Sequence, residues 1–394
     1  MFFDFYLSEM SVSDLHGGGL TLQRILGDDL MDIAAFVYVN RFAIDLPATD
    51  RYAERSIYIE PFWQRDAVRK KIGRSLAASL GKKLFMIKRH AAVAAKLLYK
   101  KFGDKELSVL VCPQGANAIF TLEALKKHRQ LKYVTWIMDD HLLEFIDGGW
   151  QYPKDIEPVY KKHLQEASHI FVISPAMQQF YLDRFGVEST VLFGSSDTAA
   201  NPSQLELVAG NEVKIGYFGA VAGWQMDALE AFSEAISGTK TSLHIYSGIK
   251  ELPESLNLPN VIFKGRIPSA DVLPAMQSYN GVLLPISFRQ KFRYMSQFYI
   301  ATKMSEYLAS GVPVLALGPD YAAMITYLQN NGAAITVTST EVDGITSGLN
   351  LLKNEHKVEQ ILNNAASLVE TETGAAPMRN RWASALQQYL YNFT

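Results

Sequence analysis

The sequence predicts an α/β fold made of two Rossmann-like domains, and three observations carry this prediction. Apolar runs of strand length alternate with helix-length amphipathic segments along the chain, which is the pattern of parallel sheets with crossover helices. A chain of 394 residues is longer than the ~250–300 residues at which a single core stops growing. A polar, turn-rich segment at 195–211 interrupts the alternation near the middle, as a domain linker does.

The individual strands and helices follow from this alternation. Their apolar runs have no polar face, as expected for parallel sheets covered by helices on both sides. The expected strands of the first half are Phe2–Leu7, Ile33–Val39, Val109–Val111, Tyr133–Met138, Ile170–Ile173 and Thr190–Phe193, with helices at Ala116–Lys127 and Pro175–Phe185. Those of the second half are Val213–Phe218, Ser242–Tyr246, Val261–Phe263, Gly281–Pro285 and Val312–Leu317.

The predicted domains are therefore an N-terminal one at 1–200 and a C-terminal one at 212–375. A final helix at 376–394 is expected to pack back toward the N-terminal domain, because the apolar residues of Arg379–Tyr391 recur at helical spacing.

Composition excludes several classes of protein. Apolar residues make up 48% and charged residues 20% of the chain, which argues against disorder. Cys112 is the only cysteine, so no intramolecular disulfide is expected, and a reducing compartment fits. No apolar run reaches the ~20 residues of a membrane-spanning helix, and the N-terminus lacks the basic start of a signal peptide. We therefore expect a cytoplasmic protein that is soluble or peripheral on the inner face of the cell membrane.

Charge is unevenly distributed although the net charge is only −2. Between Arg65 and Glu106 there are thirteen basic and three acidic residues. This basic insertion in the N-terminal domain, at about 65–106, reads as amphipathic helices, with apolar residues at Leu76, Leu80, Leu84 and Ile87, and then at Val93, Leu97, Leu98 and Phe102. Three roles are open: a solvated outer face of the domain, a surface for anionic lipid, or, less favoured, a nucleic-acid contact.

The most informative segment is Tyr299–Leu317, YIATKMSEYLASGVPVLAL. Helical spacing places Met304, Tyr307 and Leu308 on one face and Lys303, Glu306 and Ser310 on another. Gly311 stands where a helix end needs a left-handed residue. A helix that starts at Thr302 after a strand and loop offers free N–H groups to a diphosphate, and Glu306 can accept hydrogen bonds from ribose. The alternative is an ordinary surface pair of Lys303 with Glu306.

This segment resembles the donor-binding motif P-x-K-x-x-E-Y-x-A-x-G-x-P-V of the family 4 retaining glycosyltransferases, the glycosyl transferases group 1. Other segments resemble that family in the right order. They are His16–Gly19, Ala167–Pro175, Gly216–Trp224, Phe263–Pro268 and Leu283–Ser287. The resemblance implies the GT-B architecture, in which parallel sheets face each other across a cleft. It also implies a nucleotide diphosphate sugar as co-substrate, with no cofactor and no metal.

The resemblance also implies roles for individual residues. The expected donor-binding residues are Gly17, Gly18, Gly19, Gly219, Arg266, Arg293, Thr302, Lys303 and Glu306. Two departures from the family pattern concern charge. The position eight before Glu306, usually acidic, is Phe298, and 220–227 has no basic residue. Neutralising the leaving diphosphate must then depend on other cations, for which we expect Arg266, Arg293 and Lys303, with Arg289 and Lys291 as further candidates.

Asp139, Asp140 and His141 follow a buried strand directly. Carboxylates at such a position are exposed, hydrogen-bonded or functional. Many members of the family have a sugar-contacting histidine at the position of Asp139, so Asp139 or His141 is expected to position or deprotonate the acceptor. A metal site and a helix N-cap at Asp140 are the alternatives.

Taken together, the sequence predicts a metal-independent sugar transferase whose catalytic residues are Asp139, His141, Arg266 and Lys303. Its partners would be a nucleotide-sugar donor and a glycan or lipid-linked acceptor of surface polysaccharide or glycoconjugate synthesis. The alternatives are a catalytically silent binding protein and a nucleotide-sugar epimerase of the same architecture.

Overall fold

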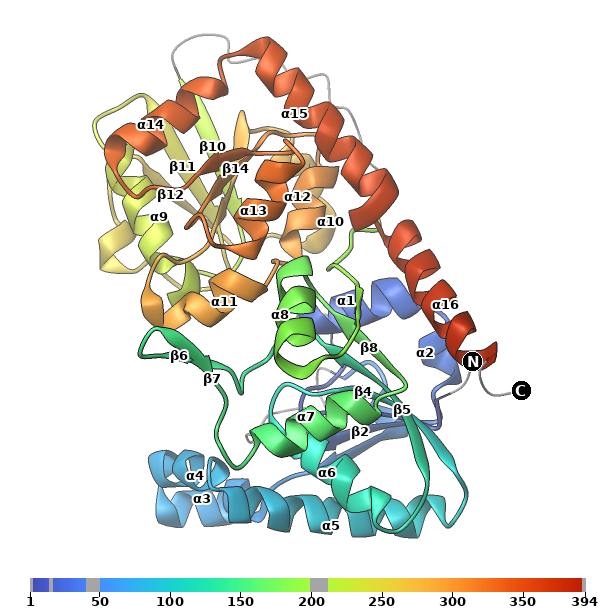
Figure 1. Ribbon diagram of the computed structural model, residues 1–394. Coiled ribbons are helices and arrows are strands. Elements are labelled where there is room, and N and C mark those ends of the chain that lie inside the picture. Colours follow the sequence, from blue (N-terminus) through green and yellow to red (C-terminus); the bar gives the residue numbers. More distant parts are fainter. Residues whose placement is uncertain (1–2, 14–16, 40–49, 199–211, 392–394) are drawn as a thin grey trace. The chain divides into compact units, whose positions relative to one another are not determined.

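The computed structural model describes residues 3–13, 17–39, 50–198 and 212–391, with helices and parallel sheets alternating throughout (Figure 1). His16 and residues 199–211 of the predicted linker lie outside these ranges. Contacts divide the chain into two compact units. Unit 1 comprises Met1–Leu192 and Arg379–Thr394, and unit 2 comprises Phe193–Met378.

Unit 1 is built on a seven-stranded parallel sheet in the order β3-β2-β1-β4-β5-β8-β9. The sheet strands are β1 (Phe5–Ser8), β2 (Ala35–Val39), β3 (Ser56–Ile59), β4 (Leu107–Cys112), β5 (Leu131–Ile137), β8 (His169–Val172) and β9 (Thr190–Val191). A small antiparallel hairpin stands apart from this sheet and is formed by β6 (Glu144–Ile146) and β7 (Gly149–Gln151). The order reverses between β1 and β4, which is where open α/β sheets bind their ligands.

The helices of unit 1 connect these strands and cover the sheet. They are α1 (Gly17–Leu26), α2 (Asp29–Asp32), α3 (Asp66–Ile72), α4 (Arg74–Gly81), α5 (Leu84–Phe102), α6 (Ala116–Lys126), α7 (Glu157–Glu166) and α8 (Pro175–Phe185). The core lies where strand residues such as Phe5, Val37 and Val109 meet Ala94 of α5 and Leu122 of α6, all of them fully buried.

Unit 2 is built on a six-stranded parallel sheet in the order β12-β11-β10-β13-β14-β15. Its strands are β10 (Val213–Phe218), β11 (Thr241–Tyr246), β12 (Val261–Gly265), β13 (Gly281–Pro285), β14 (Val314–Leu317) and β15 (Ile335–Val337). In chain order this is 3-2-1-4-5-6, the arrangement of dinucleotide-binding Rossmann domains. The switch point falls between β10 and β13, so the residues after β10 are the first place to look for a ligand.

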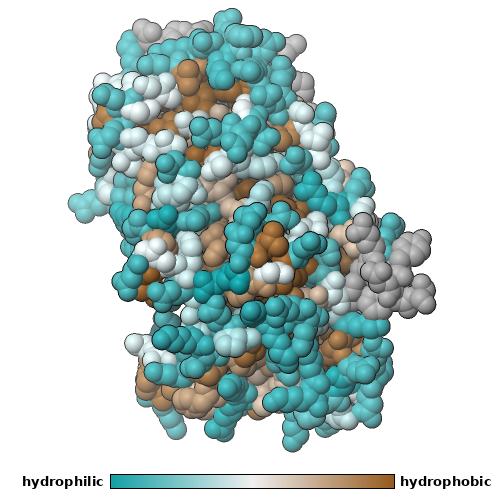
Figure 2. Space-filling view, in the orientation of Figure 1, coloured by the Kyte–Doolittle hydropathy of each residue, from teal (hydrophilic) through white to brown (hydrophobic). Residues whose placement is uncertain are grey.

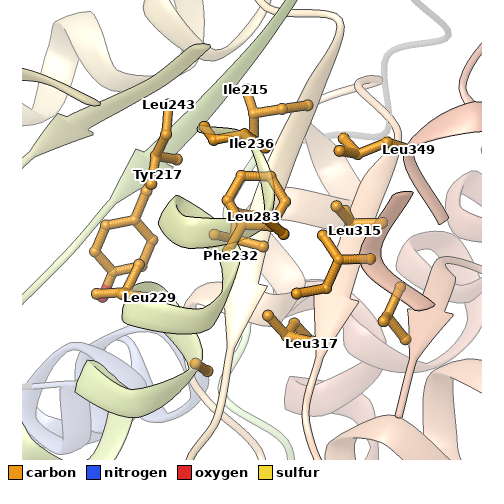
Figure 3. Packing of buried hydrophobic residues seen from close by; sticks show 14 of the residues in the cluster. Ile215, Tyr217, Leu229, Phe232, Ile236, Leu243, Leu283, Leu315, Leu317 and Leu349 are labelled. Atoms are coloured by element: carbon orange, nitrogen blue, oxygen red, sulfur yellow. The ribbon is translucent and has the colours of Figure 1, made fainter. Parts of the chain in front are cut away.

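The described residues of unit 2 also form α-helices that accompany these strands. They are α9 (Gly223–Ala235), α10 (Ser269–Met276), α11 (Arg293–Phe298), α12 (Lys303–Ala309), α13 (Ala323–Asn330), α14 (Val342–Leu351) and α15 (Glu355–Leu368). The core packs β10 and β14 against α9 and α14, through buried side chains that include Ile215, Leu315, Phe232 and Leu349 (Figure 3). The last helix, α16 (Ala375–Tyr391), begins in unit 2 and continues in unit 1.

The predicted fold class is confirmed, since the chain forms two separate parallel sheets covered by helices. The structure adds β3, β15 and the hairpin, which the apolar pattern did not reveal. No helix among the described residues is long and apolar enough to cross a bilayer.

Candidate functional site

The end of β10 is held by the hydroxyl of Tyr307. This oxygen accepts a hydrogen bond from the Phe218 N–H at 2.9 Å and donates one to the Phe218 carbonyl at 3.1 Å. Tyr307 is fully buried together with Met304 and Leu308, so these three side chains attach α12 to the core. Lys303 and Glu306 lie on the half-buried side of the same helix. Ser310 differs from the predicted pattern because it is buried, and its hydroxyl donates to the Tyr307 carbonyl.

The helix ends as the sequence predicts. Gly311 has φ = 71°, which is the left-handed conformation that favours glycine. The chain then enters β14 after Pro313. This short turn fixes where α12 stands between β13 and β14.

The ammonium of Lys303 lies beside the backbone of Gly219. A Cβ atom at position 219 would stand 2.0 Å from Lys303 Nζ, so only glycine leaves room for the ammonium. Lys303 Nζ donates to the Tyr217 hydroxyl at 3.4 Å and lies 4.7 Å from the centre of the Tyr217 ring. Burial lowers the pKa of Lys303 to about 8, and the Glu306 carboxylate opposes this shift. The cation is thus poorly solvated and available to an anion.

A cavity of about 230 Å³ opens at this edge of the sheet. It lies after the ends of β10, β11 and β12, where a Rossmann domain holds its nucleotide. Tyr246 stacks on Phe218 with ring centres 4.6 Å apart, which forms an aromatic wall. The residues that line the cavity are Phe218, Gly219, Tyr246, Ser247, Gly248, Ile267, Val272, Met276 and Glu306. The structure therefore brings together three predicted donor-binding residues: Gly219, Lys303 and Glu306.

The remaining predicted donor-binding residues of unit 2 have other surroundings. Arg266 is exposed after β12, next to Ile267 of the cavity lining. The guanidinium of Arg293 lies 4.3 Å from the centre of the Tyr321 ring, and its Nε donates to Gln297. Thr302 faces Gly194, where a Cβ atom would stand 2.7 Å from the Thr302 Cα.

The structure also shows the contacts of the further basic candidates, Arg289 and Lys291, and the burial of Phe298. Arg289 forms an ion pair with Glu230 at 3.2 Å. Lys291 lies 4.9 Å from the centre of the Phe292 ring. Phe298, which stands where the family motif has an acid, is buried.

Asp227 is a residue that the sequence analysis missed. Its carboxylate accepts hydrogen bonds from the Ser287 hydroxyl at 2.6 Å and from the Phe288 N–H at 2.8 Å. It therefore ties α9 to the loop after β13, on either side of the switch point. The sequence signal that could have identified Asp227 is an acidic residue in the helix that follows β10, the first strand of unit 2.

In unit 1 the three glycines form the first turn of α1. A Cβ atom at Gly18 would lie 3.3 Å from the Met138 sulfur, and one at Gly19 would stand 2.2 Å from the Ser13 carbonyl oxygen. Gly17 is exposed. The glycines thus let α1 approach Met138, which directly precedes Asp139.

Asp139 and Asp140 are neighbours with different surroundings. Asp140 is buried, and its Oδ2 accepts hydrogen bonds from Tyr152 at 2.6 Å, Tyr181 at 2.8 Å and Tyr160 at 3.4 Å. Its Oδ1 accepts from the Leu142 N–H. This network is structural. Of the sequence alternatives for Asp140, the helix N-cap is wrong, because the residues that follow it form a turn.

Asp139 is only half-buried and is the carboxylate that remains available for chemistry. Burial raises the pKa of Asp139, and His141 opposes this shift. His141 lines a second cavity of about 140 Å³, together with Lys82, Asn117 and Glu144. Within the described part of the chain, no three His, Cys, Asp or Glu side chains are grouped so as to hold a metal ion.

Glu9 is a second residue that the sequence analysis missed, at the switch point of unit 1. Its carboxylate accepts hydrogen bonds from the N–H groups of Gln114 and Ala118, each at 2.8 Å. It occupies the anion position at the start of α6. Glu9 directly follows β1 as Asp139 follows the apolar run of β5, so the rule that selected Asp139 would also have selected Glu9.

The likeness to known proteins is one of structure. No protein-family model matches the sequence, and no curated protein matches it. Sucrose-phosphate synthase from Thermosynechococcus elongatus is 13% identical over 99% of both chains, with a TM-score of 0.68. HepE from Anabaena, solved with UDP and glucose, is 15% identical over 98% of this chain and 99% of that chain, with a TM-score of 0.63.

TarM from S. aureus, solved with Fondaparinux, alpha-GlcNAc-glycerol and UDP, is 17% identical with a TM-score of 0.55. The match covers 75% of this chain and 58% of the TarM chain, so this chain spans less than two thirds of the length of TarM. At these identities the likeness defines the fold. The chain has the GT-B fold of glycosyltransferases, with unit 2 carrying the Rossmann strand order and the cavity described above.

Proposed function

We propose that the protein is a glycosyltransferase that moves a sugar from a nucleotide diphosphate sugar to a glycan or lipid-linked acceptor, with retention of configuration. The observation that carries the proposal is the convergence of Lys303, Gly219 and Glu306 at the end of β10. This is the switch point of a Rossmann sheet, where nucleotides bind. The structural neighbours that were solved with UDP support the same class of donor.

In this proposal the nucleoside of the donor binds in the cavity and its diphosphate binds beside Lys303. A volume of about 230 Å³ is below the ~300–1,000 Å³ of sites that enclose a whole ligand, so the cavity would hold the nucleoside part alone. Glu306, in the cavity lining, would accept hydrogen bonds from the ribose hydroxyls. The diphosphate would lie beside Gly219, where its oxygens can contact the Lys303 ammonium that the missing side chain accommodates.

The chemistry that these groups would support is departure of the nucleoside diphosphate. The bond between the anomeric carbon and the phosphate oxygen breaks, and negative charge builds on that oxygen. A prearranged cation in a poorly solvated site stabilises such charge most. Lys303 would supply it without a metal, with exposed Arg266 as a second cation. Retention is carried only by the family resemblance of the 302–314 segment.

The acceptor would be handled by unit 1. Asp139 and His141 are the proposed residues, because Asp139 is the available carboxylate after β5 and His141 lines the second cavity. The acceptor hydroxyl would form the new bond to the anomeric carbon and pass its proton to Asp139 or His141. Asp139 or His141 would hold the hydroxyl in position for this step.

A donor panel tests the proposal. UDP-, GDP-, dTDP- and ADP-sugars should be screened by thermal shift, where a ligand at 100 times its Kd stabilises the fold by about 2.7 kcal/mol. Glu306→Gln should remove the shift, whereas Glu359→Gln, on the exposed face of α15, should retain it. Absence of any shift across the panel would refute a nucleotide-sugar site.

Product analysis separates the alternatives. A transferase releases nucleoside diphosphate and consumes acceptor in equal amounts. Interconversion of the donor sugars without release would indicate an epimerase instead. Donor binding with neither outcome, across an acceptor panel, would indicate a silent binding protein.

A further inference from the structure

The helices α3–α5 and the 3-10 turn before them carry a concentration of exposed apolar side chains. Isolated exposed apolar residues are common in proteins, but here they gather in one segment. Of the thirteen large apolar residues that are exposed in the described part of the chain, six fall between positions 62 and 99. They are Phe62, Leu76, Phe85, Val93, Leu97 and Tyr99. We refer to them, with the basic residues of the same helices, as the α3–α5 face.

The α5 helix shows how this face is organised. Its buried side includes Met86, Ile87, Ala94 and Leu98 and packs on the domain. Phe85, Val93 and Leu97 recur at multiples of four residues on the other side and are 65%, 52% and 49% exposed. The amphipathic spacing of 65–106 predicts Ile87 and Leu98 on the same apolar faces as Leu76, Val93 and Leu97. The structure corrects this, because the first two are buried and the other three reach solvent.

The charge of the α3–α5 face is almost entirely positive. Lys88, Arg89, Lys96, Lys100 and Lys101 lie on α5, which has no acidic residue. Further basic residues are Arg65, Arg69, Lys70, Lys71, Arg74, Lys82 and Lys83. In the described structure, the only one of these twelve that pairs with a carboxylate is Arg69, with Asp66 at 2.5 Å. The Arg89 guanidinium lies 5.2 Å from the centre of the exposed Phe62 ring.

We infer that the α3–α5 face docks on the surface of an anionic lipid bilayer. Exposed apolar side chains can enter the boundary between headgroups and acyl chains while lysines and arginines stay at the headgroups. Each basic residue near an anionic surface raises partitioning about fivefold. A nucleic acid would complement the charge but would gain nothing from Leu76, Val93 and Leu97, whose aliphatic side chains do not stack on bases. Figure 2 shows apolar residues among hydrophilic ones along the lower edge, where Figure 1 places these helices.

Docking here has a consequence for the substrate, which rests on the proposed function. Lys82, one of the basic residues of the α3–α5 face, lines the second cavity together with His141, whereas Ile87 in the same lining belongs to the buried side of α5. An acceptor anchored in the bilayer would therefore meet the proposed acceptor residues beside the docked face. This favours a lipid-linked acceptor over a free glycan.

Vesicle sedimentation without donor or acceptor tests the inference on the full chain. Vesicles that mix phosphatidylcholine with anionic phosphatidylglycerol should bind the protein at least about tenfold more strongly than vesicles of phosphatidylcholine alone. Binding should weaken as salt rises. Equal binding to both kinds of vesicle would overturn the inference.

Variants distinguish apolar insertion from charge alone. Phe85→Ser and Leu97→Ser should each weaken binding about tenfold, and Lys88→Gln with Lys96→Gln should weaken it more. The matched control is Ile262→Ser, an exposed apolar residue of unit 2, which should bind as the wild type does. Undiminished binding of Phe85→Ser and Leu97→Ser would contradict docking through this face.

A further arm measures a single-stranded oligonucleotide by anisotropy. Binding to it that is tighter than to anionic vesicles would overturn the inference in favour of nucleic acid, whether or not Phe85→Ser weakens that binding. The donor thermal shift of Phe85→Ser should equal that of the wild type. A failure of lipid docking therefore leaves the sugar-transfer proposal standing, and a failure of donor binding leaves lipid docking standing.

Discussion

Replacing Gly219 by alanine should displace the Lys303 ammonium while leaving the fold intact. The backbone at 219 lies outside the left-handed region, so alanine can adopt it. Its Cβ would stand 2.0 Å from Lys303 Nζ, 3.0 Å from Cε and 3.4 Å from the Tyr217 hydroxyl. The ammonium must move by roughly 1–1.5 Å to reach normal contact, because the lysine tail is the flexible partner. The ammonium then loses its contact with Tyr217 and becomes more exposed to water.

The size of the effect follows from the interaction that is lost. A hydrogen bond to a charged group contributes about 1.5–3 kcal/mol, so donor affinity should fall roughly 10- to 150-fold. The free energy of unfolding should change by less than about 1 kcal/mol, since glycine-to-alanine changes of this kind also reduce the entropy of the unfolded chain. The pKa of Lys303 should rise from about 8 toward that of an exposed lysine, because burial is what lowers it.

Two measurements check this reasoning. The pH dependence of Lys303 acylation, followed by peptide mass spectrometry, reports its pKa without donor. A double-mutant cycle with Lys303→Met reports whether the loss of affinity acts through Lys303. The control is Gly149→Ala in unit 1, outside the cavity, whose Cβ would make only an ordinary contact of 3.9 Å with the Ile146 carbonyl. The reasoning is refuted if Gly219→Ala leaves the pKa near 8, or weakens donor binding equally when Lys303 is absent.

Three further predictions concern single groups. Donor affinity should fall as pH rises through about 8, because the cationic form of Lys303 binds the diphosphate. Titration calorimetry across pH 6.5–9.5 checks this, and a donor affinity that does not change with pH would contradict it. Asp140→Asn should lower the free energy of unfolding by roughly 2–4 kcal/mol, whereas Asp139→Asn should reduce turnover and leave stability unchanged. If instead Asp139→Asn destabilises the protein and Asp140→Asn only reduces turnover, Asp139 is the structural residue and Asp140 the functional one. Tyr307→Phe should cost about 1–3 kcal/mol in urea unfolding, since it leaves the buried N–H and carbonyl of Phe218 without their partner; an unchanged midpoint would show that these groups find other partners.

Most of the fold could be predicted from local pattern. The helix Pro175–Phe185 was predicted at the residues where it occurs, because Ser174 accepts the Met177 N–H and proline starts the helix. Two strands were not predicted, and each omission has a physical reason. The β3 edge strand is mostly half-buried and lacks a continuous apolar run, and β15 has only three residues.

The candidate site was less predictable because its properties come from distant residues. Nothing local distinguishes Asp139 from Asp140, and the distinction is made by three tyrosines 12, 20 and 41 positions later. The depressed pKa of Lys303 likewise depends on burial of its ammonium beside Gly219, far away in the sequence. Residue type and helical spacing can nominate such groups, but their ionisation depends on the tertiary contacts.

The continuation of α16 into unit 1 means that the core of unit 1 includes a helix that follows unit 2 in the sequence. Trp382 is 2% exposed and stands 4.8 Å from Phe171 and 5.8 Å from Trp136, ring centre to ring centre. Its indole N–H donates to Asp29. A protein cut after Leu192 would leave these aromatic rings facing water, at a cost of several kcal/mol. Unit 1 should therefore not fold from the first 192 residues alone, and during synthesis it cannot be completed before α16 has been made.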